Sequence, residues 1–243
     1  MPHDVVALPT ADEVVQQVLQ DVIEYVARHC VNGADVHIAL TGGTAGTRIN
    51  KALLSNETIR TCRTLHFWFS DERYVPRGHE DRNDLNLEHL LEGCEARVHH
   101  IKGPDESSSV QESAQLYASE LHLATTTRFC SDNTMMDITI LGLGPDGHVA
   151  SLFPHSETLT ATNAIVAVTN SPKPPPVRVS WTYPTINASR QVWLVATGEA
   201  KAEAVALLLA EHGDTEQAIA QTPACGVQGK QETRLYVDFA AQN

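Results

Sequence analysis

Apolar residues follow two periods along this chain, and each period predicts a different kind of element. Between Val14 and Val26 they recur every three or four positions, which predicts a helix. The capping box Thr10-Ala11-Asp12-Glu13 precedes this helix, and Asn32-Gly33 is expected to end it. The same helical period recurs in a stretch that ends at Leu54 and over residues 85–91, 108–127 and 200–210.

Short apolar runs bounded by turn residues predict strands. They cover residues 36–40, 65–70, 98–101, 137–141, 164–168, 177–181, 191–196 and 235–237. Because strands alternate with helices, the sequence predicts an α/β fold with a largely parallel sheet and helices on both faces. No internal repeat or long linker divides the chain, and the proline-rich segment 172–176 is interpreted as an internal loop. We therefore expect one α/β domain over residues 1–243.

Composition and charge narrow the classes of ligand. Hydrophobic residues make up 42% of the 243 residues, which is enough for a core, and no run of 18 apolar residues predicts a membrane span. The first 20 residues lack the pattern of a secretory signal, so we expect a cytoplasmic protein. The net charge of −13 argues against nucleic acid and membranes as partners. An anionic ligand would need a local pocket of cations and backbone N–H groups.

The spacing of cysteine and histidine argues against disulfides and metal sites. The cysteines are odd in number and widely spaced, with no C-x-x-C pair, so we expect buried free thiols at Cys30, Cys62, Cys94, Cys130 and Cys225. The 12 histidines show neither H-E-x-x-H nor H-x-H spacing. No bound metal is therefore expected.

Three predicted strands run into loops of unusual composition, and in parallel sheets ligands bind beyond the carboxyl ends of strands. The first loop, Thr41–Thr47, places Gly42, Gly43 and Thr44 ahead of a predicted helix. Its glycines allow a ligand to approach the backbone, and a helix start offers N–H groups to phosphate. The Walker sequence is absent, and a tight turn with threonine caps is the alternative.

The second loop carries Asp71-Glu72-Arg73 after an aromatic-rich strand. Arg73 can hold a phosphate or carboxylate in a forked contact. Alternatively, the three charges neutralise one another at a surface turn.

The third loop, Gly142–His148, contains a G-x-G-x-x-G sequence. Pro145 and Asp146 argue against a dinucleotide site there, and no acidic residue stands where ribose recognition needs one. A histidine after Asp-Gly at a predicted helix start suits acid–base chemistry, with Asp146 orienting His148. A capped turn with an exposed histidine is the alternative.

Longer stretches around these loops resemble the glucosamine-6-phosphate isomerase/6-phosphogluconolactonase family. They are Leu40–Thr44, Phe69–Val75, Leu141–Pro154, Arg178–Pro184 and Thr197–Ala202, and they follow in order across most of the chain. The resemblance, which is to its 6-phosphogluconolactonase members, implies a fold related to glucosamine-6-phosphate deaminase. It also implies hydrolysis of 6-phospho-D-glucono-1,5-lactone in the oxidative pentose phosphate pathway, with neither a metal nor an organic cofactor.

The resemblance implies roles for individual residues. His148 matches the family's catalytic histidine, and Asp146 matches the acid beside it. The phosphate-side loop is matched by Gly42, Gly43 and Thr44, and positions that bind phosphate or the sugar acid are matched by Arg73, Arg178 and Lys201. One departure is Asp81-Arg82-Asn83, where Arg82 replaces the usual serine. Arg82 either adds a cation near the substrate or changes only the rim of the site.

We expect neutral His148 to act as general base on water and to return the proton to the ring oxygen. Loop N–H groups or an arginine remain open as the group that stabilises the oxyanion. A glucosamine-6-phosphate deaminase is the nearest alternative, but its Ala-Phe-Asn-Glu-Pro stretch reads Ala150-Ser151-Leu152-Phe153-Pro154 here. A non-catalytic sugar-phosphate sensor is the second alternative, and it would not need His148 or Asp146.

Overall fold

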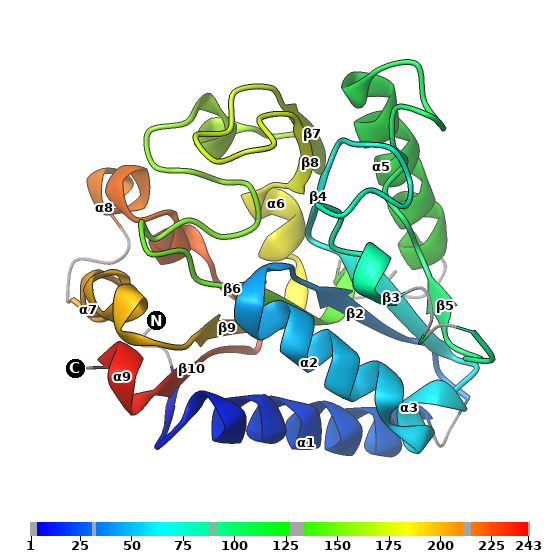
Figure 1. Ribbon diagram of the computed structural model, residues 1–243, viewed down its shortest axis with the longest axis horizontal. Helices are drawn as coiled ribbons and strands as arrows, with labels where there is room; N and C mark the ends of the chain where they lie inside the picture. Colours follow the sequence, from blue (N-terminus) through cyan, green and yellow to red (C-terminus); the bar gives the residue numbers. More distant parts are fainter. Residues whose placement is uncertain are drawn as a thin grey trace.

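The computed structural model describes residues 4–30, 33–87, 90, 92–126, 134–210 and 215–242. Its centre is a seven-stranded sheet whose paired strands all run parallel (Figure 1). The predicted parallel sheet is therefore confirmed. In spatial order its strands are β1 (Asp4–Leu8), β10 (Glu232–Asp238), β9 (Ser189–Ala196), β6 (Met136–Gly142), β2 (Val36–Leu40), β3 (Leu65–Phe69) and β5 (Arg97–Val98).

Helices lie on both sides of this sheet, as the sequence predicts. Figure 1 shows one group below the central strands: α1 (Ala11–Cys30), α2 (Gly43–Ser55) and α3 (Glu57–Arg60). Above them lie α5 (Val110–Thr126) and α6 (Tyr183–Ile186). The other helical elements are α7 (Ala202–Leu209), α8 (Glu216–Gln221), α9 (Phe239–Gln242) and the 3₁₀ turns η1 (Leu85–Leu87), η2 (Glu157–Thr160), η3 (Glu199–Lys201) and η4 (Pro223–Gly226).

The first helix forms for the reasons the sequence predicts. The Oγ1 of Thr10 donates to the Glu13 carboxylate at 2.8 Å and accepts the Glu13 backbone N–H at 3.3 Å, which is the expected capping contact. A stripe of valines on one face of α1, including Val14, Val18 and Val22, is fully buried. Burial of each such side chain stabilises the fold by roughly 1.5–3 kcal/mol.

A second, three-stranded antiparallel sheet contains β4 (Asp71–Arg73), β8 (Arg178–Trp181) and β7 (Ile165–Val168). The sequence interpretation of Asp71-Glu72-Arg73 as a loop is therefore wrong. This segment pairs with β8 so that Arg73 lies opposite Arg178. The pairing joins residues about a hundred positions apart, and a short charged segment carries no apolar pattern that would predict it.

Several predicted boundaries shift. The predicted helix 85–91 appears as η1, while residues 88, 89 and 91 lie outside the described residues, as do Asn32 and residue 127. The predicted strand 98–101 starts earlier and is shorter, as β5. The pattern predicts neither β1 nor α8. No helix in the described ranges combines the length and apolarity needed to cross a bilayer.

The described cysteines carry free thiols, as predicted. Cys225 is buried, but Cys30, Cys62 and Cys94 are only partly buried, so the expected burial is wrong for these three. Cys30 ends α1, and the other two lie in loops, where the core does not enclose them. Cys130 lies outside the described residues.

The parallel order brings the carboxyl ends of β2, β3, β6 and β9 to one edge of the sheet. Hydrogen bonds join the residues that follow β3 and β6 to the ends of the neighbouring strands β2 and β9. The Ser70 N–H donates to Leu40 O at 3.0 Å, and the Leu143 N–H donates to Val195 O at 2.9 Å. The loops that the sequence analysis singled out therefore meet at this edge.

Candidate active site

A cavity of about 440 Å³ opens at this carboxyl edge. Sites for small molecules usually have volumes of roughly 300–1,000 Å³, so a phosphorylated sugar acid fits the scale. Asp146 does not line the cavity but contacts the ring of His148. Seven of the eight predicted site residues do line it, namely Gly42, Gly43, Thr44, Arg73, His148, Arg178 and Lys201.

The first loop has the predicted strand–loop–helix form. Gly42 caps α2 without a side chain, so no capping group competes with an anion for the N–H groups of the first turn. Gly43 has φ of +76°, a left-handed conformation that favours glycine. The Thr41 hydroxyl accepts the Gly142 N–H at 3.2 Å and so ties this loop to β6.

His148 and Asp146 form the central pair of the site, with a hydrogen bond between Nδ1 and Oδ1. Burial alone would raise the pKa of Asp146, but the bond from His148 and the charge of Lys173 hold that pKa well below its usual value. An ionised carboxylate only accepts hydrogen bonds, so Nδ1 carries the proton. The lone pair of the neutral ring is therefore on Nε2, where it can act as a base.

The glycines of the third loop shape the turn beneath this pair. A Cβ on Gly144 would lie 1.9 Å from Nδ1 of His148 and 2.6 Å from Oδ1 of Asp146. The predicted helix start at His148 is wrong, because Val149 and Leu152 form an isolated bridge and η2 begins only at Glu157. The G-x-G-x-x-G sequence here makes room for the histidine–aspartate pair.

Lys173 is a site residue that the sequence analysis missed. It lines the cavity, and its Nζ lies 3.0 Å from Oδ1 of Asp146 and 3.2 Å from Nδ1 of His148. It belongs to the proline-rich segment interpreted as an internal loop. A lysine between prolines was a weak signal, and only the tertiary contact with Asp146 shows its place.

Arg178 holds that loop in position. The Arg178 residue is 4% exposed. Its guanidinium donates to the carbonyl oxygens of Lys173 and Pro175, both at 3.0 Å. It also lies 3.7 Å from the Asp71 carboxylate, which accepts the Ser151 hydroxyl at 2.7 Å. Most N–H groups of the Arg178 guanidinium are thus hydrogen-bonded within the protein.

Arg73, Lys173 and Lys201 are the more accessible cations of the cavity. Arg73 donates to Asp81 O at 2.5 Å and lines the cavity from β4. Burial lowers the pKa of Lys201, and repulsion from the positive charge of Lys173 lowers this pKa further. This is the local positive pocket that an acidic chain needs to bind an anion.

Comparison with known proteins agrees with these features. Residues 9–236 match the family described as glucosamine-6-phosphate isomerases/6-phosphogluconolactonase. The chain belongs to this family.

Relatives named 6-phosphogluconolactonase match most of the chain. The Streptomyces coelicolor protein is 38% identical over 214 residues, covering 84% of this chain and 80% of the relative. The Mycobacterium tuberculosis protein is 35% identical over 206 residues, covering 83% and 81%. The solved 6-phosphogluconolactonase of Thermotoga maritima has a TM-score of 0.79 at 26% identity, covering 97% and 99%. A monomeric glucosamine-6-phosphate deaminase shares the fold, with a TM-score of 0.77 at 16% identity, covering 98% of each chain.

Arg82, the departure from the family pattern, does not line the cavity. It is 2% exposed, and Nε and Nη2 donate to both carboxylate oxygens of Asp84 at 2.8 and 2.7 Å. Nη2 also donates to Ile101 O at 2.7 Å. Both expected roles are therefore wrong, because buried carboxylates draw this arginine into the interior.

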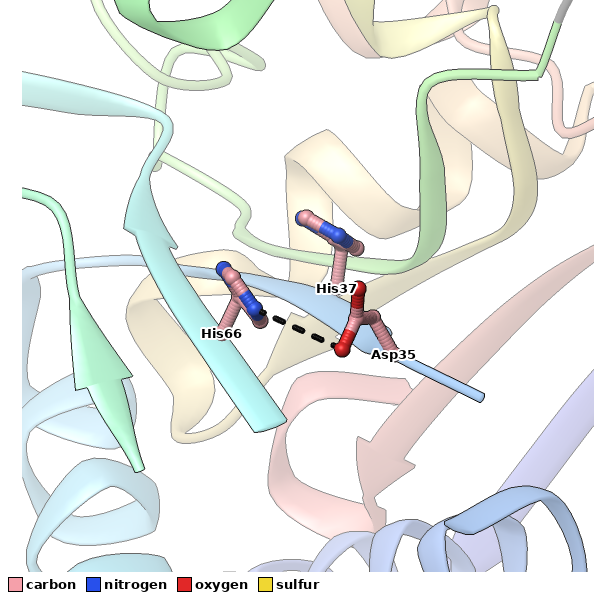
Figure 2. A group of neighbouring side chains, drawn as sticks. All are labelled: Asp35, His37 and His66. Atoms are coloured by element: carbon pink, nitrogen blue, oxygen red, sulfur yellow. Dashed lines mark ion pairs between the residues drawn. The ribbon is translucent and has the colours of Figure 1, made fainter. Parts of the chain in front are cut away.

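One group of side chains in this family member has the composition of a metal site. The ligand atoms of Asp35, His37 and His66 all lie within 4.8 Å of one another, at the amino ends of β2 and β3 (Figure 2). However, Trp68 Nε1 donates to His37 Nδ1 at 3.0 Å, so a neutral His37 carries its proton on Nε2. Metal-binding histidines instead donate from the second ring nitrogen. We assign no metal to this group.

Substitution of Gly144 by alanine should lower kcat/KM of this family member by at least about tenfold. The new Cβ would collide with His148 Nδ1, and displacement of a catalytic group by about 1 Å can cost 10²-fold. Gly33→Asn is the matched control, because a Cβ at Gly33 would meet nothing within 4 Å and asparagine tolerates the φ of +70° at this position. Steady-state assays of both variants measure kcat/KM. A Gly144→Ala enzyme with the wild-type value would contradict the expectation.

Proposed function

We propose that this chain hydrolyses 6-phospho-D-glucono-1,5-lactone to 6-phosphogluconate, in the oxidative pentose phosphate pathway. The observation that carries the proposal is the His148–Asp146 pair beside a cavity lined by Arg73, Lys173 and Lys201. Its relatives named 6-phosphogluconolactonase support the same reaction.

The histidine supplies general base catalysis. Nε2 of His148 takes a proton from water while the water oxygen bonds to C1 of the lactone. The tetrahedral intermediate then breaks its C1–O5 bond, and the imidazolium returns the proton to O5. The product acid loses its own proton to solvent. Asp146 fixes the ring orientation and stabilises the imidazolium, as the acid does in catalytic triads.

The phosphate anchors the far end of the substrate. The first turn of α2, at Gly43 and Thr44, presents N–H groups to it, and Arg73 and Lys201 supply charge. Lys173 holds the Asp146 carboxylate and adds positive charge beside the reacting group. Binding energy from the phosphate then serves to orient C1 at His148.

A coupled assay with freshly made lactone tests the function. We expect enzyme-dependent formation of 6-phosphogluconate above the spontaneous rate, and no ammonia from glucosamine 6-phosphate. Ammonia release would favour the deaminase alternative. Tight binding of 6-phosphogluconate without turnover would favour a sensor.

A further inference from the structure

Asn83 lines the active-site cavity, yet the site described so far does not use it. Its Nδ2 donates to Asp71 O at 2.9 Å, which settles which end of the amide is the oxygen. A Cβ on Gly42 would lie 2.0 Å from Asn83 Oδ1, so this oxygen lies directly against the glycine loop. The amide oxygen is thus the end of Asn83 that lies beside the loop expected to bind phosphate.

The buried side chain of Glu72 holds the backbone of Asn83 in place. Oε1 of Glu72 accepts the N–H groups of Asn83 and Arg73, both at 2.8 Å. Oε2 accepts the Asp84 N–H at 3.1 Å. The Glu72 residue is 1% exposed, so water does not compete for these bonds. One side chain therefore sets the positions of both Arg73 and Asn83.

The chemistry of an amide oxygen selects its ligand. It accepts hydrogen bonds and cannot donate, so it gains nothing from phosphate oxygens, which also accept. The hydroxyl groups of a sugar acid are donors and fit this oxygen. An acceptor beside the phosphate loop therefore recognises the part of the substrate next to the phosphate.

We propose that Asn83 Oδ1 accepts a hydrogen bond from a hydroxyl of the sugar acid, and that Glu72 is the positioning residue that holds Asn83 there. The proposal rests on the proposed function for the identity of the ligand. It makes Asn83 a specificity residue for the sugar, separate from the residues that bind phosphate.

Calorimetric binding of two probes, 6-phosphogluconate and inorganic phosphate, tests the proposal. Asn83→Ala should weaken 6-phosphogluconate binding by about threefold to tenfold, the value of one neutral hydrogen bond, and leave phosphate binding unchanged. Asn187→Ala is the matched control, because Asn187 also bridges loops, through Gly226 O and the Gln228 N–H, but lies outside the cavity lining. It should leave both affinities unchanged.

Glu72→Gln tests the positioning role. It should weaken the binding of both probes, because it releases Arg73 as well as Asn83. In the double variant with Asn83→Ala, the loss of 6-phosphogluconate affinity should be smaller than the product of the two single losses, whereas independent roles would give the full product. If Glu72→Gln does not fold, the Asn83 variant still decides the contact. Equal weakening of both probes by Asn83→Ala would overturn the proposal, as would unchanged 6-phosphogluconate binding.

Turnover is measured separately from binding. If the wild type binds 6-phosphogluconate but does not hydrolyse the lactone, the proposed function fails, while the Asn83 contact is still decided by the two affinities. If the wild type hydrolyses the lactone but does not bind 6-phosphogluconate, the Asn83 proposal fails and the proposed function stands.

Discussion

Replacement of His148 by alanine should lower kcat by roughly 10²- to 10⁴-fold, the usual contribution of a general base. Nδ1 of the ring is bound to Asp146, so Nε2 is the base that would be lost. The residues proposed to bind phosphate are unchanged in this variant, so binding of 6-phosphogluconate should survive. Initial rates in the coupled assay, after subtraction of spontaneous lactone hydrolysis, measure the effect.

His155→Asn provides the matched control. His155 is exposed and has φ of +58°, a conformation that asparagine tolerates better than most residues. This variant should keep the wild-type rate. A His148→Ala enzyme with nearly wild-type kcat would remove His148 from the role of base.

Replacement of Arg82 by alanine should cost about 3–5 kcal/mol of unfolding free energy, because it removes the guanidinium that pairs with the buried Asp84 carboxylate. The Arg82 and Asp84 side chains are each 1% exposed and 2.7 Å apart, and the Glu72 carboxylate lies 4.0 Å from Arg82. For a chain of this size the loss corresponds to a fall in Tm of roughly 6–20 °C, measurable by calorimetry or circular dichroism.

Arg63→Ala is the matched control for that loss. Arg63 also grips a carboxylate with two bonds, both 3.0 Å to Glu95, but the two side chains are 80% and 40% exposed. Solvent screens such a pair, so its removal should leave Tm almost unchanged. Equal Tm values for the two variants would show that burial of the Arg82 ion pair adds nothing to thermal stability.

The pH dependence of the Tm difference between the wild type and Arg82→Ala offers a second test of the buried contacts among Glu72, Arg82 and Asp84. Burial and the charge of Asp84 raise the pKa of Glu72 to about 8, while Arg82 opposes the rise. A carboxyl whose folded pKa is raised stabilises the fold at low pH, and this contribution is lost as pH rises. Without Arg82 the folded pKa should rise further, so the Tm gap between wild type and Arg82→Ala should widen above pH 8. A gap that narrows there would contradict this account of Glu72.

The His148–Asp146 pair and the glycine loops could be predicted from the sequence because their contacts are local. Asp146 and His148 are two residues apart in one turn, and Gly42 and Gly43 lie between a strand and the helix it enters. Apolar runs also determined the central strands, since residues buried on both faces must be apolar whatever their partners. The single-domain organisation, the cytoplasmic location and the roles of the site residues stay predictions.

Tertiary structure alone decided the contacts between distant segments. Lys173 meets Asp146 across 27 positions because Arg178 folds the proline-rich loop toward the cavity. Arg82 turns inward because Asp84 and Glu72 are buried beside it, whereas a charged residue in a polar stretch is expected at the surface. The sequence of a segment gives the side chains that it carries, but long-range strand pairing and burial determine which of these side chains contact one another.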